Sequence, residues 1–153
     1  MENIEIKKLG CDNEIPYDLL LLADPSIEII NDYLHRGNCY LAYIEEKIVG
    51  VYVIIRTRPM TFELVNIAVD EAYQGKGIGK ALLFNAIDNA RELKGKILEV
   101  GTGNSSISQL TLYQKCGFRI TGVDRNFFRK HYKDKIIENG IECIDMIRLS
   151  MNL

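Results

Sequence analysis

The sequence has no tryptophan, only three prolines and no long hydrophobic run among its 153 residues. No apolar stretch approaches the ~18 residues that a membrane-spanning helix requires, so we expect no membrane association. Residues 1–8 alternate charged side chains with isoleucine and lack the apolar run of a signal peptide. These features predict a cytoplasmic protein.

Cysteine and histidine are also scarce. The four cysteines, Cys11, Cys39, Cys116 and Cys143, are scattered without a C-x-x-C pair, and the chain has only two histidines. Such spacing supports neither a zinc site nor a disulfide framework. We therefore expect no metal and four reduced thiols, as is usual in the cytosol.

A basic excess is missing as well, because 19 basic side chains face 21 acidic ones and leave a net charge of −2. This balance argues against nucleic acid as the main partner. Hydrophobic residues make up 47% and charged residues 26% of the chain, which excludes a disordered or collagen-like protein. The length predicts a single domain, residues 1–153, with a hydrophobic core large enough to be stable without disulfide bonds or structural metal ions.

Hydrophobic periodicity predicts an α+β fold. Strands are expected over 3–9, 40–44, 48–55, 62–69, 97–100, 118–124 and 142–150. Helices are expected over 15–23, 27–35, 78–93 and 106–116. This order fits neither a doubly wound parallel sheet nor a sandwich, and the charged connection before the last strand is expected to be a loop.

A glycine-rich turn, QGKGIGK at 74–80, joins the fourth predicted strand to the third helix. Closely spaced glycines and a helix N-terminus leave amides open to an anion, most naturally a pyrophosphate. A P-loop does not fit, because Gln74 stands where its first glycine should be and Ala81 where its Ser or Thr should be. The dinucleotide fingerprint G-x-G-x-x-G fails because Lys80 replaces its third glycine.

Two motifs instead resemble those of the GNAT superfamily of N-acetyltransferases. Gln74, Gly77 and Gly79 match its [Arg/Gln]-x-x-Gly-x-[Gly/Ala] motif, and LYQKCGF at 112–118 is similar to its L-Y-x-K-x-G-F signature. The resemblance spans nearly the whole chain. It implies a mixed, mostly antiparallel central sheet of six to seven strands flanked by about four helices.

The resemblance also implies acetyl-CoA as cosubstrate, with its pyrophosphate on the glycine turn. The cofactor contacts are then expected from Gln74, Gly75, Lys76, Gly77, Ile78, Gly79 and Lys80. The backbone of Ile67, Ala68 and Val69 is expected to pair with CoA like an added strand, where this strand splays from the fifth. Many family members have an asparagine where this chain has Ser106, so we predict a CoA contact from the nearby Asn104, with Ser106 as the alternative.

Transfer from an activated thioester needs positioning and proton transfer more than covalent catalysis. By resemblance, Tyr113 contacts CoA and is the general acid for the departing sulfur. The alternative is an aromatic that anchors its helix to the sheet. Glu63 interrupts an apolar strand, where burial would raise its pKa and suit a general base acting through water. Its alternative role is an edge salt bridge with Arg56 or Arg58.

The acceptor is less clearly marked. Six acids and no lysine or arginine lie between Cys11 and His35, namely Asp12, Glu14, Asp18, Asp24, Glu28 and Asp32. Such a wall would attract a cationic amine, such as a polyamine, an aminoglycoside or a lysine side chain, and the alternative is two solvated helix faces. The basic and aromatic segment 125–135 has four interpretations: a contact to the 3′-phosphate of CoA, an acidic-acceptor site, a homodimer interface or a solvated loop.

These observations lead to two hypotheses. The first is an N-acetyltransferase that moves the acetyl group from acetyl-CoA to a primary amine of a small molecule or peptide, by direct attack in a ternary complex. The second is a non-catalytic acyl-CoA-binding or regulatory module. Tyr113 and Glu63 favour the enzyme, because a module that only binds CoA needs neither an acid nor a base.

Overall fold

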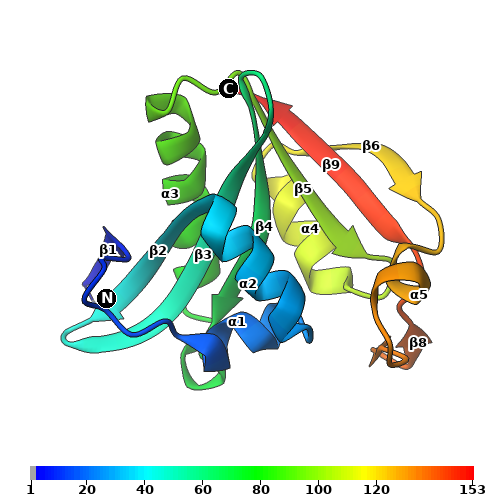
Figure 1. The fold of residues 1–153 in the computed structure, drawn as a ribbon, viewed down its shortest axis with the longest axis horizontal. Helices are drawn as coiled ribbons and strands as arrows, with labels where there is room; N and C mark the ends of the chain where they lie inside the picture. Colours follow the sequence, from blue (N-terminus) through cyan, green and yellow to red (C-terminus); the bar gives the residue numbers. More distant parts are fainter. Residues whose placement is uncertain (1–2) are drawn as a thin grey trace.

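The computed structural model describes residues 3–153 as a seven-stranded sheet with helices on both faces and a small separate hairpin (Figure 1). The strands are β1 (Ile4–Lys8), β2 (Gly37–Ile44), β3 (Lys47–Arg58), β4 (Thr61–Val69), β5 (Ile97–Gly103), β6 (Arg119–Asp124), β7 (Ile137–Glu138), β8 (Ile141–Glu142) and β9 (Met146–Asn152). The helices are α1 (Tyr17–Ala23), α2 (Ile27–Arg36), the short η1 (Glu71–Tyr73), α3 (Ile78–Glu92), α4 (Ile107–Lys115) and α5 (Phe127–His131). The predicted mixed α+β fold is confirmed.

The sheet opens in its middle. Its order is β1-β2-β3-β4-β5-β9-β6, and β4 with β5 is the parallel pair among otherwise antiparallel neighbours in the described residues. Pairing between β4 and β5 stops at Leu64 and Val100, although β4 continues to Val69 and β5 to Gly103. The expected splay is therefore confirmed, and Figure 1 shows the two strands diverging.

A bulge in β4 accompanies this splay. Val53 of β3 pairs with Asn66 and Ile54 pairs with Leu64, so Val65 is an extra residue on β4. A bulge bends its strand and increases the local twist. It lies at the point where β4 separates from β5, and it keeps both Val65 and Asn66 close to the opening.

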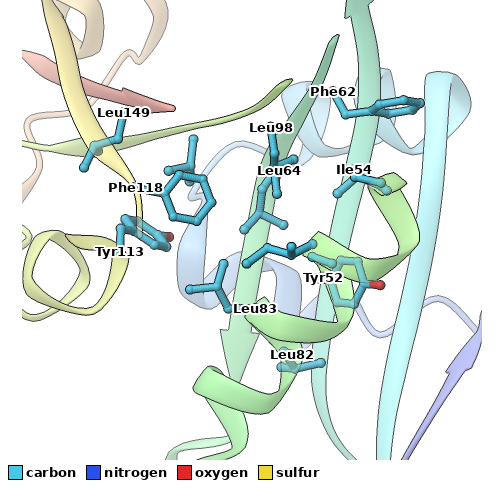
Figure 2. Packing of buried hydrophobic residues seen from close by; sticks show 14 of the residues in the cluster. Tyr52, Ile54, Phe62, Leu64, Leu82, Leu83, Leu98, Tyr113, Phe118 and Leu149 are labelled. Atoms are coloured by element: carbon cyan, nitrogen blue, oxygen red, sulfur yellow. The ribbon is translucent and has the colours of Figure 1, made fainter. Parts of the chain in front are cut away.

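Two hydrophobic clusters cover the two faces of the sheet. On one face, Leu82 and Leu83 of α3 pack with Leu64 of β4, and the cluster extends to Tyr113 and Phe118 (Figure 2). On the other face, α1 and α2 pack on β3 in a cluster whose fully buried members include Leu20, Ile30, Val51 and Val53. Each such side chain contributes about 1.5–3 kcal/mol by leaving water.

The expected helix over 78–93 is confirmed with almost the same bounds, because its apolar residues repeat at helical spacing over four turns. The loop expected after β6 is wrong in part, since it contains α5 and the β7–β8 hairpin. These elements have five or fewer residues each, too few for periodicity to reveal. Strand β5 also extends beyond its predicted end, to Gly103.

Two further observations bear on the composition. The four cysteines are all free. Within residues 3–153, no helix has the length and apolar character that crossing a membrane requires.

Candidate active site

The glycine turn leads from the end of β4, through η1, into α3. Its entry is held by Asp70, whose carboxylate accepts a hydrogen bond of 2.9 Å from the amide of Ala72. Gly75 and Gly77 have φ values of +78° and +83°, in the left-handed region where a side chain is strained. Gly77 also caps the start of α3. Glycine is thus required here by backbone conformation.

The amides of this turn are open. The first bonded amide of α3 is that of Ala81, which donates to the carbonyl of Gly77 at 3.1 Å. Amides 75–80 find no hydrogen-bond partner in the part of the chain that the structure describes. Unpaired amides at a helix N-terminus favour an anion, so the turn fits the diphosphate of coenzyme A.

A groove of about 340 Å³ runs along the turn and the free end of β4. Nine predicted cofactor residues line it: Ile67, Ala68, Val69, Gln74, Gly75, Gly77, Ile78, Gly79 and Tyr113. Lys76 and Lys80 do not line it, and their ammonium groups lie over the rings of Tyr73 and Phe84, at 5.2 and 5.8 Å from the ring centres.

The opposite wall of the groove comes from α4 and was not predicted in full. Ser108, Gln109 and Leu112 line it together with Tyr113. Positions 108 and 112, and 109 and 113, are each four apart and so share one face of the helix. Helical spacing counted back from Tyr113 would have identified Gln109.

A second cavity of about 700 Å³ adjoins the groove. Its walls come from the segment between α1 and α2, the middle of β4, the end of β5 and the chain around α5. The groove and the cavity share five lining residues: Leu22, Ala23, Ile67, Gln109 and Tyr113. The two spaces therefore meet where β4 and β5 separate.

Tyr113 stands at this junction. Its ring is 3% exposed and packs edge-on against Phe118, with ring centres 5.9 Å apart. Its hydroxyl points away from α4 (Figure 2) and makes no hydrogen bond with any described residue. Burial raises the pKa of the Tyr113 phenol, so the group stays protonated throughout the neutral range. The residue thus combines the anchoring role with a free proton donor.

Glu63 lies farther from the junction. It lies on β4, paired with Glu99 of β5, two residues before the bulged residue Val65. It lines neither the groove nor the cavity. Its side chain is 23% exposed, and Arg148 lies 4.0 Å away. Burial raises the pKa of Glu63, and the Arg148 charge partly opposes this shift. Glu63 can therefore exchange protons with the cavity only through water.

The ion-pair alternative for Glu63 involves a different arginine than expected. The sequence suggested Arg56 or Arg58, but Arg58 instead bonds Glu99 at 2.9 Å. Arg148 comes from β9, which the sheet order places two strands from Glu63. Sequence separation hides this contact.

Asn104 is not at the groove. Its amide nitrogen donates to the carbonyl of Glu142 at 3.1 Å, and its oxygen accepts from the amides of Ile144 and Asp145. The side chain thus holds the segment before β9, and it lines neither the groove nor the larger cavity. Ser106 lines the larger cavity and donates to Glu138 at 2.9 Å. The structure therefore does not support the CoA contact predicted for Asn104.

Comparison with known proteins agrees with this architecture. A family model described as an acetyltransferase (GNAT) domain matches residues 35–120, more than half of the chain. The chain belongs to the GNAT acetyltransferases. The matched region contains both motifs in full: the glycine turn at 74–80 and the signature at 112–118.

Similar proteins cover this acetyltransferase along its entire length. An uncharacterised N-acetyltransferase of Bacillus subtilis, YvbK, is 53% identical over 153 residues, covering 100% of this chain and 99% of its own. A GNAT family acetyltransferase from Elizabethkingia anophelis, solved with acetyl-CoA bound, is 51% identical with a TM-score of 0.98 and full coverage of both chains. An IAA acetyltransferase from Bacillus cereus is 54% identical with a TM-score of 0.95, covering 99% of this chain and 100% of its own.

Proposed function

We propose that this acetyltransferase moves the acetyl group of acetyl-CoA to a primary amine of a small molecule or peptide, by direct attack within a ternary complex. The observation that carries the proposal is the meeting of two separate spaces at Ile67 and Tyr113. A protein that only stored or sensed an acyl-CoA would need the groove but not the adjoining cavity. Two bound reactants that meet at one point need no covalent enzyme intermediate.

The groove is the proposed site of acetyl-CoA. The open amides around Gly77 and Gly79 would hold the diphosphate, and the free edge of β4 at Ile67–Val69 would pair with the pantetheine arm. The structure of the Elizabethkingia relative with acetyl-CoA bound supports this assignment, because the two chains share their fold over their full length. Bound acetyl-CoA supplies an activated thioester, so no nucleophilic side chain is required.

Tyr113 is the proposed general acid. Its hydroxyl donates a proton to the sulfur as the carbon–sulfur bond breaks, and the phenol is then reprotonated from solvent. The raised pKa keeps the Tyr113 phenol protonated before each turnover. Glu63, acting through water, is the proposed acceptor of the proton that the attacking amine loses. The neutral amine nitrogen bonds to the acetyl carbon before the carbon–sulfur bond breaks, and free coenzyme A leaves after its sulfur is protonated.

Thiol release from acetyl-CoA, measured across a panel of primary amines, tests the proposal. The panel contains a polyamine, an aminoglycoside, a lysine-containing peptide and a peptide with a free α-amine. Turnover with at least one amine and stoichiometric acetylation by mass spectrometry are expected. Tight CoA binding by calorimetry without acetylation of any amine would contradict the proposal and favour a binding module.

A further inference from the structure

A buried carboxylate lies on the wall of the larger cavity. Asp24 is 6% exposed and follows the last turn of α1, where its own amide donates to the carbonyl of Leu20 at 3.1 Å. Its carboxylate accepts hydrogen bonds from the Ser26 amide at 3.1 Å and from the Tyr33 hydroxyl at 3.2 Å. Burial raises the pKa of Asp24, and these bonds and the nearby Tyr132 hydroxyl oppose the rise.

This carboxylate has no cationic partner. No lysine, arginine or histidine within residues 3–153 forms an ion pair with Asp24, and none of the groups that shift its pKa is a cation. Buried charges in proteins are nearly always paired, because an unpaired ion loses its hydration without compensation. The missing partner therefore points to a cation that comes from outside the chain.

Asn66 gives an independent indication on the same cavity wall. Its residue is 3% exposed, and its amide nitrogen donates to the Leu20 carbonyl at 3.0 Å and to the Tyr33 hydroxyl at 2.8 Å. A carbonyl can only accept, so the nitrogen must face Leu20 and the amide orientation is determined. The oxygen of Asn66 is left buried without a partner among the described residues. The cavity wall thus carries one acceptor without a hydrogen-bond partner, the Asn66 oxygen, and one carboxylate without a cationic partner, Asp24.

Tyr33 connects these two acceptors. Its hydroxyl accepts from Asn66 and donates to Asp24, so both side chains are fixed by one hydrogen-bonded chain. Asn66 directly precedes Ile67, which lines both the groove and the cavity. Asp24, Asn66 and the proposed reaction point at Tyr113 therefore border the same cavity, and a primary ammonium has the three donors needed to bind both oxygens.

We propose that Asp24 and the Asn66 oxygen form the ammonium-binding site for the acceptor, which makes this acetyltransferase selective for cationic primary amines. The proposal rests on the proposed function and names its substrate class. It assigns Asp24 to binding rather than to proton transfer. Of the six acids expected to form an acidic wall, Asp24 carries this role because it is the buried one that lines the cavity.

The test compares Asp24→Asn with Asp18→Asn in steady-state assays on the best amine of the panel. Asp18 is another of the six acids, but it is exposed on α1 and lines neither the cavity nor the groove. Asp24→Asn should raise KM for the amine about tenfold or more while kcat and KM for acetyl-CoA change less than about threefold. Asp18→Asn should leave all three constants within about twofold. An unchanged amine KM in Asp24→Asn would overturn the proposal.

A second measurement needs no variant and separates this proposal from the proposed function. Hexylamine and 1-hexanol have the same length but differ in charge, and each is titrated calorimetrically into wild-type protein saturated with CoA. At least about tenfold tighter binding of the amine is expected, and equal binding would overturn the site. This comparison stands even where no amine is acetylated, an outcome that contradicts only the proposed function.

Discussion

The groove and the larger cavity are built in opposite ways. The groove binds with backbone, through open amides of the glycine turn and the unpaired edge of β4, all within residues 67–79. The rest of its lining comes from α4 and from Leu22 and Ala23 of α1. The cavity instead presents side chains from segments far apart, including Asp24 after α1, Asn66 on β4 and Tyr132 after α5.

This difference explains why one site is visible in the sequence and the other is not. Backbone amides are exposed by local conformation, which adjacent glycines and a helix start already encode. A side-chain site depends on where distant segments meet, and a motif of contiguous residues cannot record that. If the proposed function holds, coenzyme recognition is encoded locally, whereas acceptor recognition depends on the tertiary contacts of this chain.

Tyr113→Phe should have the largest effect, because it removes the proton donor where groove and cavity meet. We expect kcat to fall about 100-fold or more, with the affinity for acetyl-CoA nearly unchanged, since the ring and its packing on Phe118 remain. Thiol release under saturating conditions measures this. Tyr40→Phe, stacked on Tyr52 away from both spaces, is the control. A Tyr113→Phe enzyme with wild-type kcat would exclude the assigned acid.

Gly79→Val should damage the groove alone. Gly79 is in helical backbone, and an added Cβ would lie 3.8 Å from Val69, so the fold tolerates it. Gly77 is a poorer target, because its φ of +83° would strain any side chain. We expect CoA affinity by calorimetry to fall about tenfold or more, with little change in melting temperature.

The matched control for this variant is Gly122→Val on β6, where an added Cβ meets nothing within 4 Å. It should bind CoA like the wild type. Equal CoA affinity of Gly79→Val and the wild type would mean that the diphosphate does not lie on this turn.

Glu63→Gln should have a smaller effect that depends on pH. Because burial raises the pKa of Glu63, the base becomes active only as pH rises through that raised pKa, and kcat should fall on the acidic side above the ordinary carboxylate range. In the variant, the acidic limb of the kcat profile should disappear and kcat should fall about tenfold. Glu99→Gln, its neighbour on β5, should keep the acidic limb but shift it to lower pH, because the Glu99 charge helps to raise the pKa of Glu63. If the acidic limb of the kcat profile is unchanged in Glu63→Gln, that limb belongs to the titration of another group.

Tyr33→Phe should have the smallest effect and concerns the stability of the cavity wall. It removes the hydroxyl that joins Asn66 to Asp24, and we expect the free energy of unfolding to fall by about 1–2 kcal/mol, since buried polar groups lose a partner. Thermal melts should show a decrease of several degrees. Tyr17→Phe, whose hydrogen bond to Asn31 is only partly buried, should cost less. A larger loss of stability in Tyr17→Phe than in Tyr33→Phe would contradict the buried hydrogen bonds that link Asn66, Tyr33 and Asp24.

Much of the fold followed from periodicity, because helices such as α3 and strands such as β4 are long enough to repeat their apolar residues several times. The short α5 and the β7–β8 hairpin were missed for lack of length. At the site, the glycine turn and Tyr113 were found, while Lys76, Lys80 and Asn104 line neither space. The contacts of Asn104 with 142–145 could not be predicted, because these residues approach it only in the folded chain.

The sequence alone determined the parts whose geometry is local: the positive-φ glycines at 75 and 77, the helix start that follows them, and the signature that carries Tyr113. The tertiary structure decided which side chains share a cavity. It brought Asp24 beside Asn66 and Tyr132, and it turned Glu63 toward Arg148. The reason is physical, because backbone conformation depends on neighbouring residues, whereas burial and pairing of a charge depend on everything that packs around it.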